Sequence, residues 1–397
     1  MSQWSVRSAT DGDQPAMSQL AATCFGEYTH PEARRPWQLM VAANGWMVVD
    51  DGDDIVGMAC YLDLQLTVPG GVPLPAAGVS AVAVAPTHRR RGVLRAMYDE
   101  LHDRVARAGY PIAALTASEG GIYGRFGYGP ATIERGLAVQ RRFAEIHADV
   151  PDTGQVRLVQ PREHREQFLD IYERWRRVTP GGLACPETLW DDVLLDRDSD
   201  RGGASAWFGL LHPDGFAMYR VRHGETSTAR VEAMRVLTPE AHAALWRVLL
   251  GLDLMDQVLI DTHPGDPLPY LLVDTRQAKT TSQVDALWLR IMDVPACLTA
   301  RRYRADISVV LDVVDQFRSD GGRFALDVRD GVAQCVPTDA PADLQLNTDV
   351  LGSLYLGVHS ASDLAAAHRI RYRNRDLLQR ADLAFRGEVP AALGFHF

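Results

Sequence analysis

Apolar residues along this chain alternate between short β-branched runs and segments with helical spacing. The clearest junction is VSAVAVAPTHRRRGVLR at 79–95, where a strand-like run meets a basic turn. Beyond Gly92, apolar residues fall near one helical face: Val93, Leu94, Met97, Leu101 and Val105. The pattern predicts a strand over 79–84 and a helix over 92–108, ending at Gly109 as a C-terminal cap.

The residues before this junction predict the rest of a small mixed unit. Two short helices are expected at 15–25 and near 37–40, before an antiparallel meander. Its strands are predicted at 46–49 and 55–66, with an Asp/Gly turn between them. A Pro/Gly-rich stretch over 68–75 is expected to lead into the strand at 79–84, and a further buried strand over 111–117.

A second segment repeats this order. It predicts helices at 164–176 and 186–195, a hairpin with arms at 206–211 and 215–221, and a strand at 230–237. Thr238, Pro239 and Glu240 then form a typical helix start: an N-cap, a proline at N1 and an acid in the first turn.

From about residue 294 the pattern changes to an antiparallel sheet with helices. Strands are predicted at 307–314, 323–329 and 331–336, and helices at 349–355 and 362–370. A chain of 397 residues is too long for one ordinary core. We therefore predict three domains, at residues 1–148, 149–293 and 294–397.

Composition narrows the possible partners. The net charge of −10 disfavours nucleic acid and attracts cations. No apolar run approaches the roughly 18 residues of a membrane span, and the N-terminus lacks the apolar core of a signal peptide, so a cytoplasmic protein is expected. The five cysteines have no regular spacing, which argues against a disulfide framework or a metal site.

The basic turn has the features of an anion site, because the free N–H groups and the dipole of a helix start face the same point. Its motif, Arg89-x-x-Gly92-x-Leu94, is not a nucleotide-hydrolase or dinucleotide loop. It resembles the pyrophosphate loop of GNAT acyl-CoA N-acyltransferases, although Leu94 replaces a second small residue. The alternative is an ordinary strand–helix turn with a solvated basic patch.

The GNAT resemblance implies that loop amides hold the pyrophosphate of CoA and that the preceding strand binds the pantetheine arm. The expected cofactor-binding residues are Val82, Ala83, Val84, Arg90, Arg91, Gly92, Val93, Leu94, Arg95, Ser118 and Glu119.

Tyr123-x-x-Phe126-Gly127-Tyr128 resembles a second GNAT element, in which the tyrosine lies near the thioester sulfur. A leaving thiolate whose thiol has a pKa near 8.5 can take a proton from a phenol with a pKa of about 10. Tyr123 is therefore the candidate general acid. The alternative is that these aromatic side chains only pack in a Gly-rich turn.

Longer stretches resemble the Eis (enhanced intracellular survival) family of N-acetyltransferases: SAVAVAPTHRRRGVLRAM, SEGGIYGRFGYGPAT, IYERWR, LLHPDG, THPGDPLPYLL, LWLRIMDVPA and VLGSLYLGVH. This resemblance implies an α+β protein with tandem GNAT folds, the second degenerate, and a C-terminal sterol-carrier-protein-like domain. It also implies a homohexamer built as a dimer of trimers, and acetyl transfer from acetyl-CoA to amines of an aminoglycoside, with no metal.

The family resemblance further implies that the C-terminal carboxylate, here that of Phe397, acts as the general base. The family's substrate pocket corresponds to Phe25, Glu27, Trp37 and Ser80. The simpler alternatives are a solvated terminus, and core positions for Phe25 and Trp37.

Two positions depart from the family pattern and concern the substrate range. His396 stands where an acid is usual, and Ala81 where a phenylalanine is frequent. Two functional alternatives stay open: a lysine N-acetyltransferase acting on proteins or peptides, and a non-enzymatic protein that binds CoA or a lipid.

Overall fold

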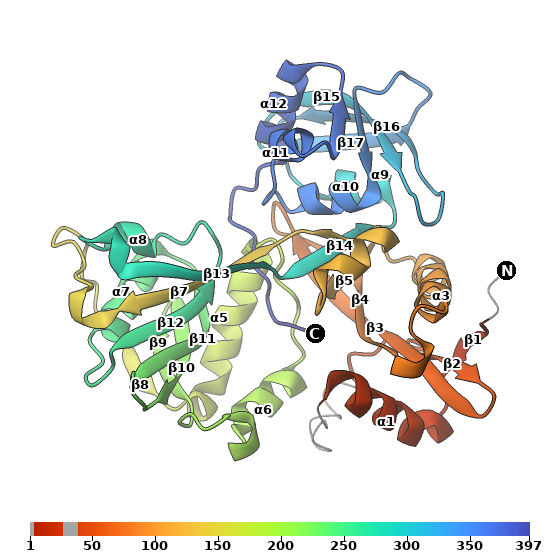
Figure 1. Ribbon diagram of the computed structural model, residues 1–397. Helices are drawn as coiled ribbons and strands as arrows, with labels where there is room; N and C mark the ends of the chain where they lie inside the picture. The colour runs from red at the N-terminus through yellow and green to blue at the C-terminus, as the bar shows by residue number, and fades with distance from the viewer. Residues whose placement is uncertain (1–3, 27–38) are drawn as a thin grey trace.

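The computed structural model describes residues 4–26 and 39–397, which form three sheets with helices packed on them (Figure 1). Two seven-stranded sheets lie side by side, and a five-stranded sheet sits above them in the view of Figure 1. The α+β class is confirmed, with two mixed sheets and a smaller C-terminal unit. Within the described residues, no helix is both long and apolar enough to cross a bilayer.

The first sheet has the order β1-β2-β3-β4-β5-β14-β6. Its strands are β1 (Val6–Ser8), β2 (Met47–Asp51), β3 (Asp54–Val68), β4 (Val72–Val84), β5 (Ile112–Thr116), β14 (Leu287–Ile291) and β6 (Gly129–Pro130). Helix α1 (Gln14–Phe25) packs against Val48 on one face, and α3 (Val93–Arg107) packs against Val49 on the other. The predicted helix after Gly92 is confirmed; the expected stretch near 37–40 falls largely outside the described residues.

The expected connection over 68–75 is instead part of a long hairpin. The chain turns at 69–71, and β4 begins at Val72, so that Pro73 and Pro75 pair with β3. A proline is tolerated in a strand where it removes no ladder hydrogen bond. β5 pairs with β4 only from Ala76 onward, so these prolines have no strand on that side.

The second sheet has the order β13-β7-β12-β11-β10-β9-β8. Its strands are β13 (Ala278–Asp285), β7 (Ile133–Gln140), β12 (Gln257–Thr262), β11 (Thr228–Val236), β10 (Gly215–Arg222), β9 (Phe208–His212) and β8 (Arg157–Val159). The helices are α5 (Arg165–Val178), α6 (Glu187–Leu195), α7 (Pro239–Leu250) and the short α8 (Leu268–Leu271). The predicted start of α7 is confirmed, because the Thr238 side chain accepts a hydrogen bond from the Ala241 N–H at 3.2 Å.

The two large sheets exchange strands. β7 precedes the predicted boundary at residue 148 but pairs with β12 and β13 of the second sheet. β14 follows the middle segment yet inserts between β5 and β6 of the first sheet. The sheets therefore do not follow contiguous segments of chain, and the boundaries at 148 and 293 stay a prediction.

The third sheet has the order β17-β16-β15-β18-β19. Its elements are β15 (Ile307–Val314), β16 (Gly322–Arg329), β17 (Val332–Pro337), β18 (Leu344–Asn347), β19 (Ile370–Tyr372), α9 (Val294–Ala300), α10 (Thr348–Tyr355), α11 (Ala361–Ala366) and α12 (Arg375–Phe385). The helix expected over 362–370 is wrong at its end, because α11 stops at Ala366 and Ile370 starts an edge strand. The three predicted strands, β15, β16 and β17, are antiparallel as expected, and β18 joins the sheet parallel to β15.

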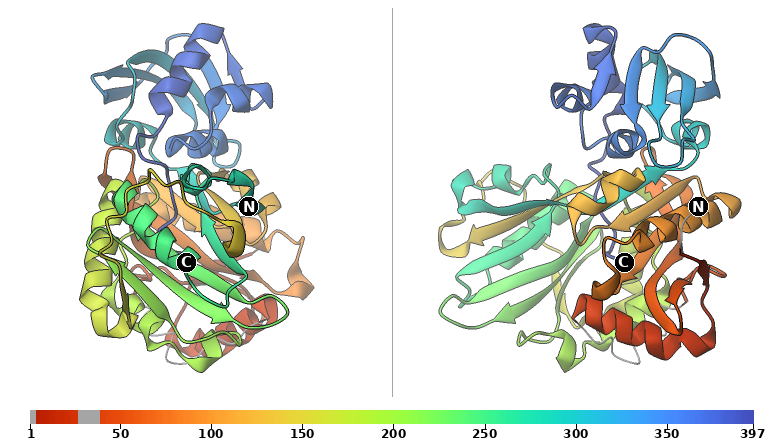
Figure 2. Two further views of the ribbon diagram at one scale, coloured as in Figure 1. Left: turned by 90° about the vertical axis from the view of Figure 1, so that its left-hand side faces the viewer. Right: turned by 45° about the vertical axis from the view of Figure 1, so that its right-hand side comes forward.

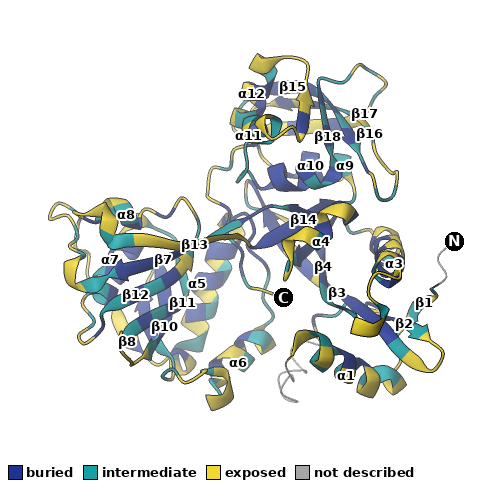
Figure 3. Cartoon of the chain, viewed as in Figure 1, coloured by how far each residue is buried: buried dark blue, intermediate teal, exposed yellow. Residues whose placement is uncertain are grey.

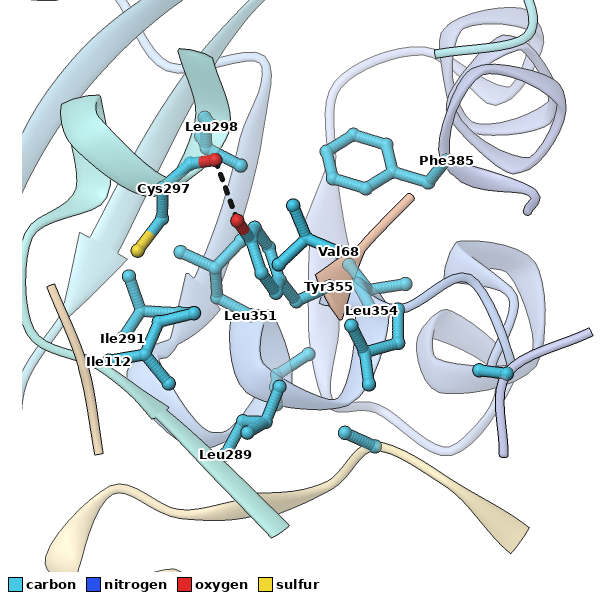
Figure 4. Close-up of a cluster of buried hydrophobic side chains, with 14 of the residues drawn as sticks. Val68, Ile112, Leu289, Ile291, Cys297, Leu298, Leu351, Leu354, Tyr355 and Phe385 are labelled. Carbon is cyan, nitrogen blue, oxygen red and sulfur yellow. Dashed lines mark hydrogen bonds between the residues drawn. The ribbon is translucent and has the colours of Figure 1, made fainter. Parts of the chain in front are cut away.

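One apolar core joins the C-terminal unit, which is built on the third sheet, to the first sheet (Figures 3 and 4). Leu351 and Leu354 of α10 belong to the same buried cluster as Ile112 of β5 and Leu289 of β14. At its centre the Tyr355 hydroxyl donates to the Cys297 carbonyl at 2.8 Å. The C-terminal unit is thus packed against the first sheet rather than tethered to it.

After α12 the chain returns and ends between the two large sheets (Figures 1 and 2). Along this tail, residues 386–397, the Ala392 N–H donates to the Pro180 carbonyl at 2.9 Å and the Gly394 N–H to the Gly181 carbonyl at 3.2 Å. A side chain on Gly181 would clash, because its Cβ would lie 2.6 Å from the Ala392 oxygen. These contacts bring the C-terminus to β4 and β5, the central strands of the first sheet.

Candidate active site

The site begins where β4 and β5 part. Their parallel pairing covers only Ala76–Gly78 against Ile112–Ala114, after which β4 continues to Val84. A bulge distorts β4 at this point, and Ala81 takes a positive φ of 51°. The expected pantetheine-binding residues 82–84 therefore lie beyond this short pairing, where main-chain groups of β4 can bind an extended ligand.

The basic loop after β4 is shaped as an anion site. Gly92 caps α3 with a φ of 89°, Arg90 has a φ of 62°, and no side chain caps the helix start. In the described part of the chain, Arg89, Arg90 and Arg91 are exposed and form no ion pair with the protein. The Trp4 indole supports the loop by donating to the Arg91 carbonyl at 2.8 Å.

Free amides, a helix dipole and unpaired guanidinium groups together fit a diphosphate. Leu94, the departure from the GNAT pattern, is half-buried among the apolar residues under α3. The loop therefore keeps the expected backbone shape with a single glycine. Residues 90–95 could hold the diphosphate of a CoA molecule.

Tyr123 ends the one-turn helix α4 (Gly120–Tyr123) and is 8% exposed. Burial raises the pKa of its hydroxyl, although a hydrogen bond with Ser118 opposes this shift. The phenol therefore keeps its proton at neutral pH, as a general acid must. Ser118 and Glu119, expected at the cofactor, are exposed and lie just before α4.

Phe397 lies in the opening between β4 and β5. The Thr116 hydroxyl, at the end of β5, donates to the terminal main-chain oxygen of Phe397 at 2.8 Å. On the other side, a Cβ on Gly78 would lie 2.9 Å from the Phe397 ring. The first sheet thus binds the terminal carboxyl group at Thr116 and contacts the Phe397 ring at Gly78, two residues before Ser80 on β4.

Of the four residues expected to contact the substrate, the structure describes Phe25 and Ser80. Phe25 is 49% exposed at the end of α1, so it is not a core residue. Ser80 is half-buried and pairs with Cys60. Glu27 and Trp37 lie outside the described residues.

The groups that hold the tail were not found from the sequence. The Arg235 guanidinium donates to the Gly394 carbonyl at 2.8 Å and lies 4.5 Å from the centre of the Trp175 ring. The His396 imidazole lies 3.6 Å from the Glu134 carboxylate. This pairing raises the pKa of His396 and lowers that of Glu134. Only contacts between distant segments identify these residues, and no local motif marks them.

A cavity of about 840 Å³ opens beside the tail in the second unit. It lies between β11, β12 and the helices α5 and α6, and its walls combine aromatic side chains with charged groups of both signs, including Trp175, Trp190, Glu134, Glu232, Asp261, Arg230, Arg235 and His396. Arg230 pairs with Asp261 and Glu232, and His396 lies beside Glu134. Its volume is within the range of small-molecule sites. Aromatic rings beside charged groups of both signs suit a polar ligand with apolar faces. Among the residues that the structure describes, no cluster of His, Cys, Asp and Glu could hold a metal ion.

Comparison with known proteins agrees with this arrangement. Residues 5–131 and 181–291 each match a family described as acetyltransferase (GNAT) domain, and residues 294–392 match the sterol carrier protein domain. The chain is 55% identical to N-acetyltransferase Eis of Mycobacterium tuberculosis, over 98% of both proteins. In structure it is similar to Eis1 of Mycobacterium abscessus, with 28% identity, a TM-score of 0.88, and 99% and 100% of the two chains covered.

A GCN5-related N-acetyltransferase from Kribbella flavida is also similar, with 26% identity, a TM-score of 0.79, and coverage of 100% of this chain and 98% of that one. The order of domains, the paired GNAT folds and the sequence identity over nearly the full length give one conclusion. This chain is a GNAT N-acetyltransferase and belongs to the Eis family.

Proposed function

We propose that this enzyme transfers acetyl groups from acetyl-CoA to amines of aminoglycoside-like polycations, by direct attack of the amine on the thioester. The observation that carries the proposal is the terminal carboxyl group of Phe397, bound by Thr116 in the opening between β4 and β5. In this proposal the basic loop and Tyr123 supply the other groups that the reaction needs.

Acetyl-CoA, when bound, supplies an activated acetyl thioester. The amides of residues 90–95 and the guanidinium groups of Arg90, Arg91 and Arg95 hold its diphosphate, and the open edge of β4 at 82–84 binds the pantetheine arm. We assign Ser118 and Glu119 to the mouth of the same site. Binding at both ends fixes the thioester relative to Tyr123 and Phe397.

The Phe397 carboxylate accepts a proton from the substrate ammonium, directly or through a water molecule, and so frees the attacking lone pair. As the new C–N bond forms and the C–S bond breaks, Tyr123 donates its phenolic proton to the departing sulfur. Two protons leave the nitrogen: the Phe397 carboxylate takes the first before attack and passes it to solvent, and the second, lost as the C–S bond breaks, restores the phenol of Tyr123 through solvent. One proton reaches the sulfur and one is released in all, and because the amine attacks the thioester directly, no enzyme nucleophile is required.

The acceptor is proposed to be a polycation because the chain as a whole is acidic and aromatic side chains lie beside the tail. Trp175 and Trp190 line the cavity beside the tail, where Glu134, Glu232 and Asp261 lie with Arg230 and Arg235, and the chain carries a net charge of −10. We add Phe25, Glu27, Trp37 and Ser80 as substrate contacts. A cytoplasmic homohexamer, arranged as two trimers, completes the proposal.

The test is release of CoA thiol from acetyl-CoA with a panel of aminoglycosides, with product mass spectra to count the acetyl groups. Wild type is compared with Tyr123→Phe and with a variant lacking Phe397. Tyr270→Phe is the matched control, since Tyr270 is 82% exposed on α8. Both active-site changes should lower kcat by about 100-fold or more, and the control should not change it.

Peptide lysines serve as a second panel of acceptors. Turnover with peptides but not with aminoglycosides would show that the acceptor is a peptide lysine, and the proposed mechanism would still apply. Full activity without Phe397 would refute the proposed base, and sedimentation analysis of the same samples would decide the hexamer.

A further inference from the structure

We infer that the buried ion pair between Arg290 and Asp315 positions the turn that carries Tyr123. Arg290 and Asp315 are thereby positioning residues, and the inference rests on the proposed role of Tyr123 as general acid. Asp315 belongs to the C-terminal unit, so the pair also gives that unit a part in catalysis.

Arg290 lies on β14 and is 1% exposed. Its guanidinium donates to the Phe126 carbonyl at 2.9 Å. It also approaches Gly127 closely, where a Cβ would be 1.9 Å from Nη1. Gly127 has a φ of 84°, so both its backbone shape and this close approach require glycine. The guanidinium thus holds the turn three and four residues after Tyr123.

Asp315 holds the other side of the guanidinium in an ion pair. Its second carboxylate oxygen accepts the N–H groups of Phe317 and Arg318, both at 3.0 Å. The loop that follows reaches back to the first unit, where Arg318 pairs with Asp103 of α3 at 2.6 Å. The C-terminal unit therefore fixes the orientation of Arg290 through one carboxylate.

Aromatic contacts link this clamp to Tyr123. The Phe126 ring stacks on Tyr98 of α3 with centroids 4.2 Å apart and meets Phe317 edge-on at 5.0 Å. Tyr98 in turn lies edge-on to Tyr123 at 6.3 Å. Within the turn, the Tyr128 N–H donates to the Tyr123 carbonyl at 3.3 Å. Movement of Phe126 is therefore transmitted to the side chain of Tyr123.

The alternative is a purely structural ion pair, and the chain offers a matched control for it. Arg301 is also fully buried in the C-terminal unit, where it donates to the carbonyls of Tyr355 and Phe385 at 2.5 and 2.7 Å. None of these partners belongs to the turn that carries Tyr123. Arg301→Lys tests the cost of disturbing a buried arginine without touching that turn.

The experiment compares Arg290→Lys, Asp315→Asn and Arg301→Lys in the full chain, each with and without Tyr123→Phe. Lysine keeps the charge of Arg290 but lacks the planar fork that joins Phe126 to Asp315. We expect Arg290→Lys and Asp315→Asn to lower kcat about tenfold, a part of what a general acid contributes, and the KM for acetyl-CoA to stay within about twofold of wild type. In the Tyr123→Phe background the same changes should have no further effect, because coupled residues are non-additive.

Equal losses in both backgrounds, or the same loss with Arg301→Lys, would overturn the inference and leave a structural role. Asp315→Asn serves if Arg290→Lys does not fold, because the amide keeps an oxygen for the loop amides. Hydrogen exchange of residues 120–128 supplies a readout without turnover, and faster exchange only in the Arg290 and Asp315 variants is expected. Wild type that releases no thiol with any amine would refute the proposed function instead, and the exchange result would still decide whether the pair orders the turn.

Discussion

Replacement of Thr116 by valine tests how the terminal carboxyl group is held. Valine has nearly the shape of threonine and suits the end of a strand, so the change removes the hydroxyl and little else. The lost contact is the 2.8 Å hydrogen bond to the main-chain oxygen of Phe397. A hydrogen bond to a charged group contributes about 1.5–3 kcal/mol, which weakens docking of the tail roughly ten- to hundredfold.

Four other contacts still hold the tail: the amides of Ala392 and Gly394, the guanidinium of Arg235, and the pairing of His396 with Glu134. The tail should therefore remain near its site while its last residue becomes mobile. We expect kcat for amine acetylation to fall about tenfold, up to the limit set by deletion of Phe397. The KM for acetyl-CoA should stay unchanged, because the basic loop is intact.

Steady-state release of CoA thiol measures both constants, and urea unfolding confirms that the fold is retained. Thr280→Val, the same replacement at an exposed position of β13, is the control. In a variant that lacks Phe397, Thr116→Val should have no further effect. An unchanged kcat in folded Thr116→Val, or an equal fall without Phe397, would refute the idea that this hydroxyl positions the base.

Three further predictions follow from contacts of the tail and of the second unit. Gly78→Ala places a Cβ 2.3 Å from Leu64 and 2.9 Å from the Phe397 ring. The change should lower the free energy of unfolding in urea by about 1–3 kcal/mol and should also lower kcat. Gly121→Ala is the control and should change neither quantity, because its Cβ meets nothing within 4 Å among the described residues. The pKa of His396 is raised and that of Glu134 is lowered, so the attraction between the two side chains is complete between the ordinary Glu pKa and the ordinary His pKa, and is lost at lower and at higher pH. Carboxypeptidase should therefore release Phe397 most slowly at about pH 4.5–6.5. The variant His396→Gln should lack this minimum. Burial raises the pKa of Asp266, but hydrogen bonds from His242, Thr262 and the Leu268 N–H outweigh burial and lower the pKa to about 2. The Asp266 carboxylate therefore stabilises the fold above pH 3.8, and this stabilisation is lost as the pH falls through about 2. Asp266→Asn should lose about 2–3 kcal/mol of unfolding free energy at pH 7 and flatten its pH dependence between these values; an unchanged slope would contradict this role of Asp266.

Local patterns predicted much of the fold. The strand, loop and helix at 79–108, the cap at Thr238 and the strand at 307–314 depend on neighbouring residues, and the structure contains each of them. The predictions were wrong where pairing with a distant segment determines the secondary structure. Pro73 and Pro75 marked a connection by composition, but β3 provides a pairing partner across the hairpin. Ile370 continued a helical pattern, but β18 pairs with it as a strand.

The candidate site divides in the same way. The basic loop and the Tyr123 turn are contiguous in sequence, so their motifs are recognisable. Phe397 entered only through the resemblance to a family, since a terminal residue carries no local pattern. Thr116, Arg235 and Arg290 had no signal at all, because each acts on a segment far away in the chain.

The exchange of β7 and β14 between the two large sheets affects how the chain is made. β5 is apolar and fully paired only after β14 inserts beside it, and Leu287 pairs with Thr116 across the whole middle unit. During synthesis at about 5–20 residues per second, β5 therefore waits on the order of ten seconds for its partner. An unpaired, apolar strand edge is a site for association with other chains. The ribosome-bound N-terminal segment thus keeps one side of β5 open until the middle segment is complete, and a fragment that ends near residue 148 lacks β14 altogether.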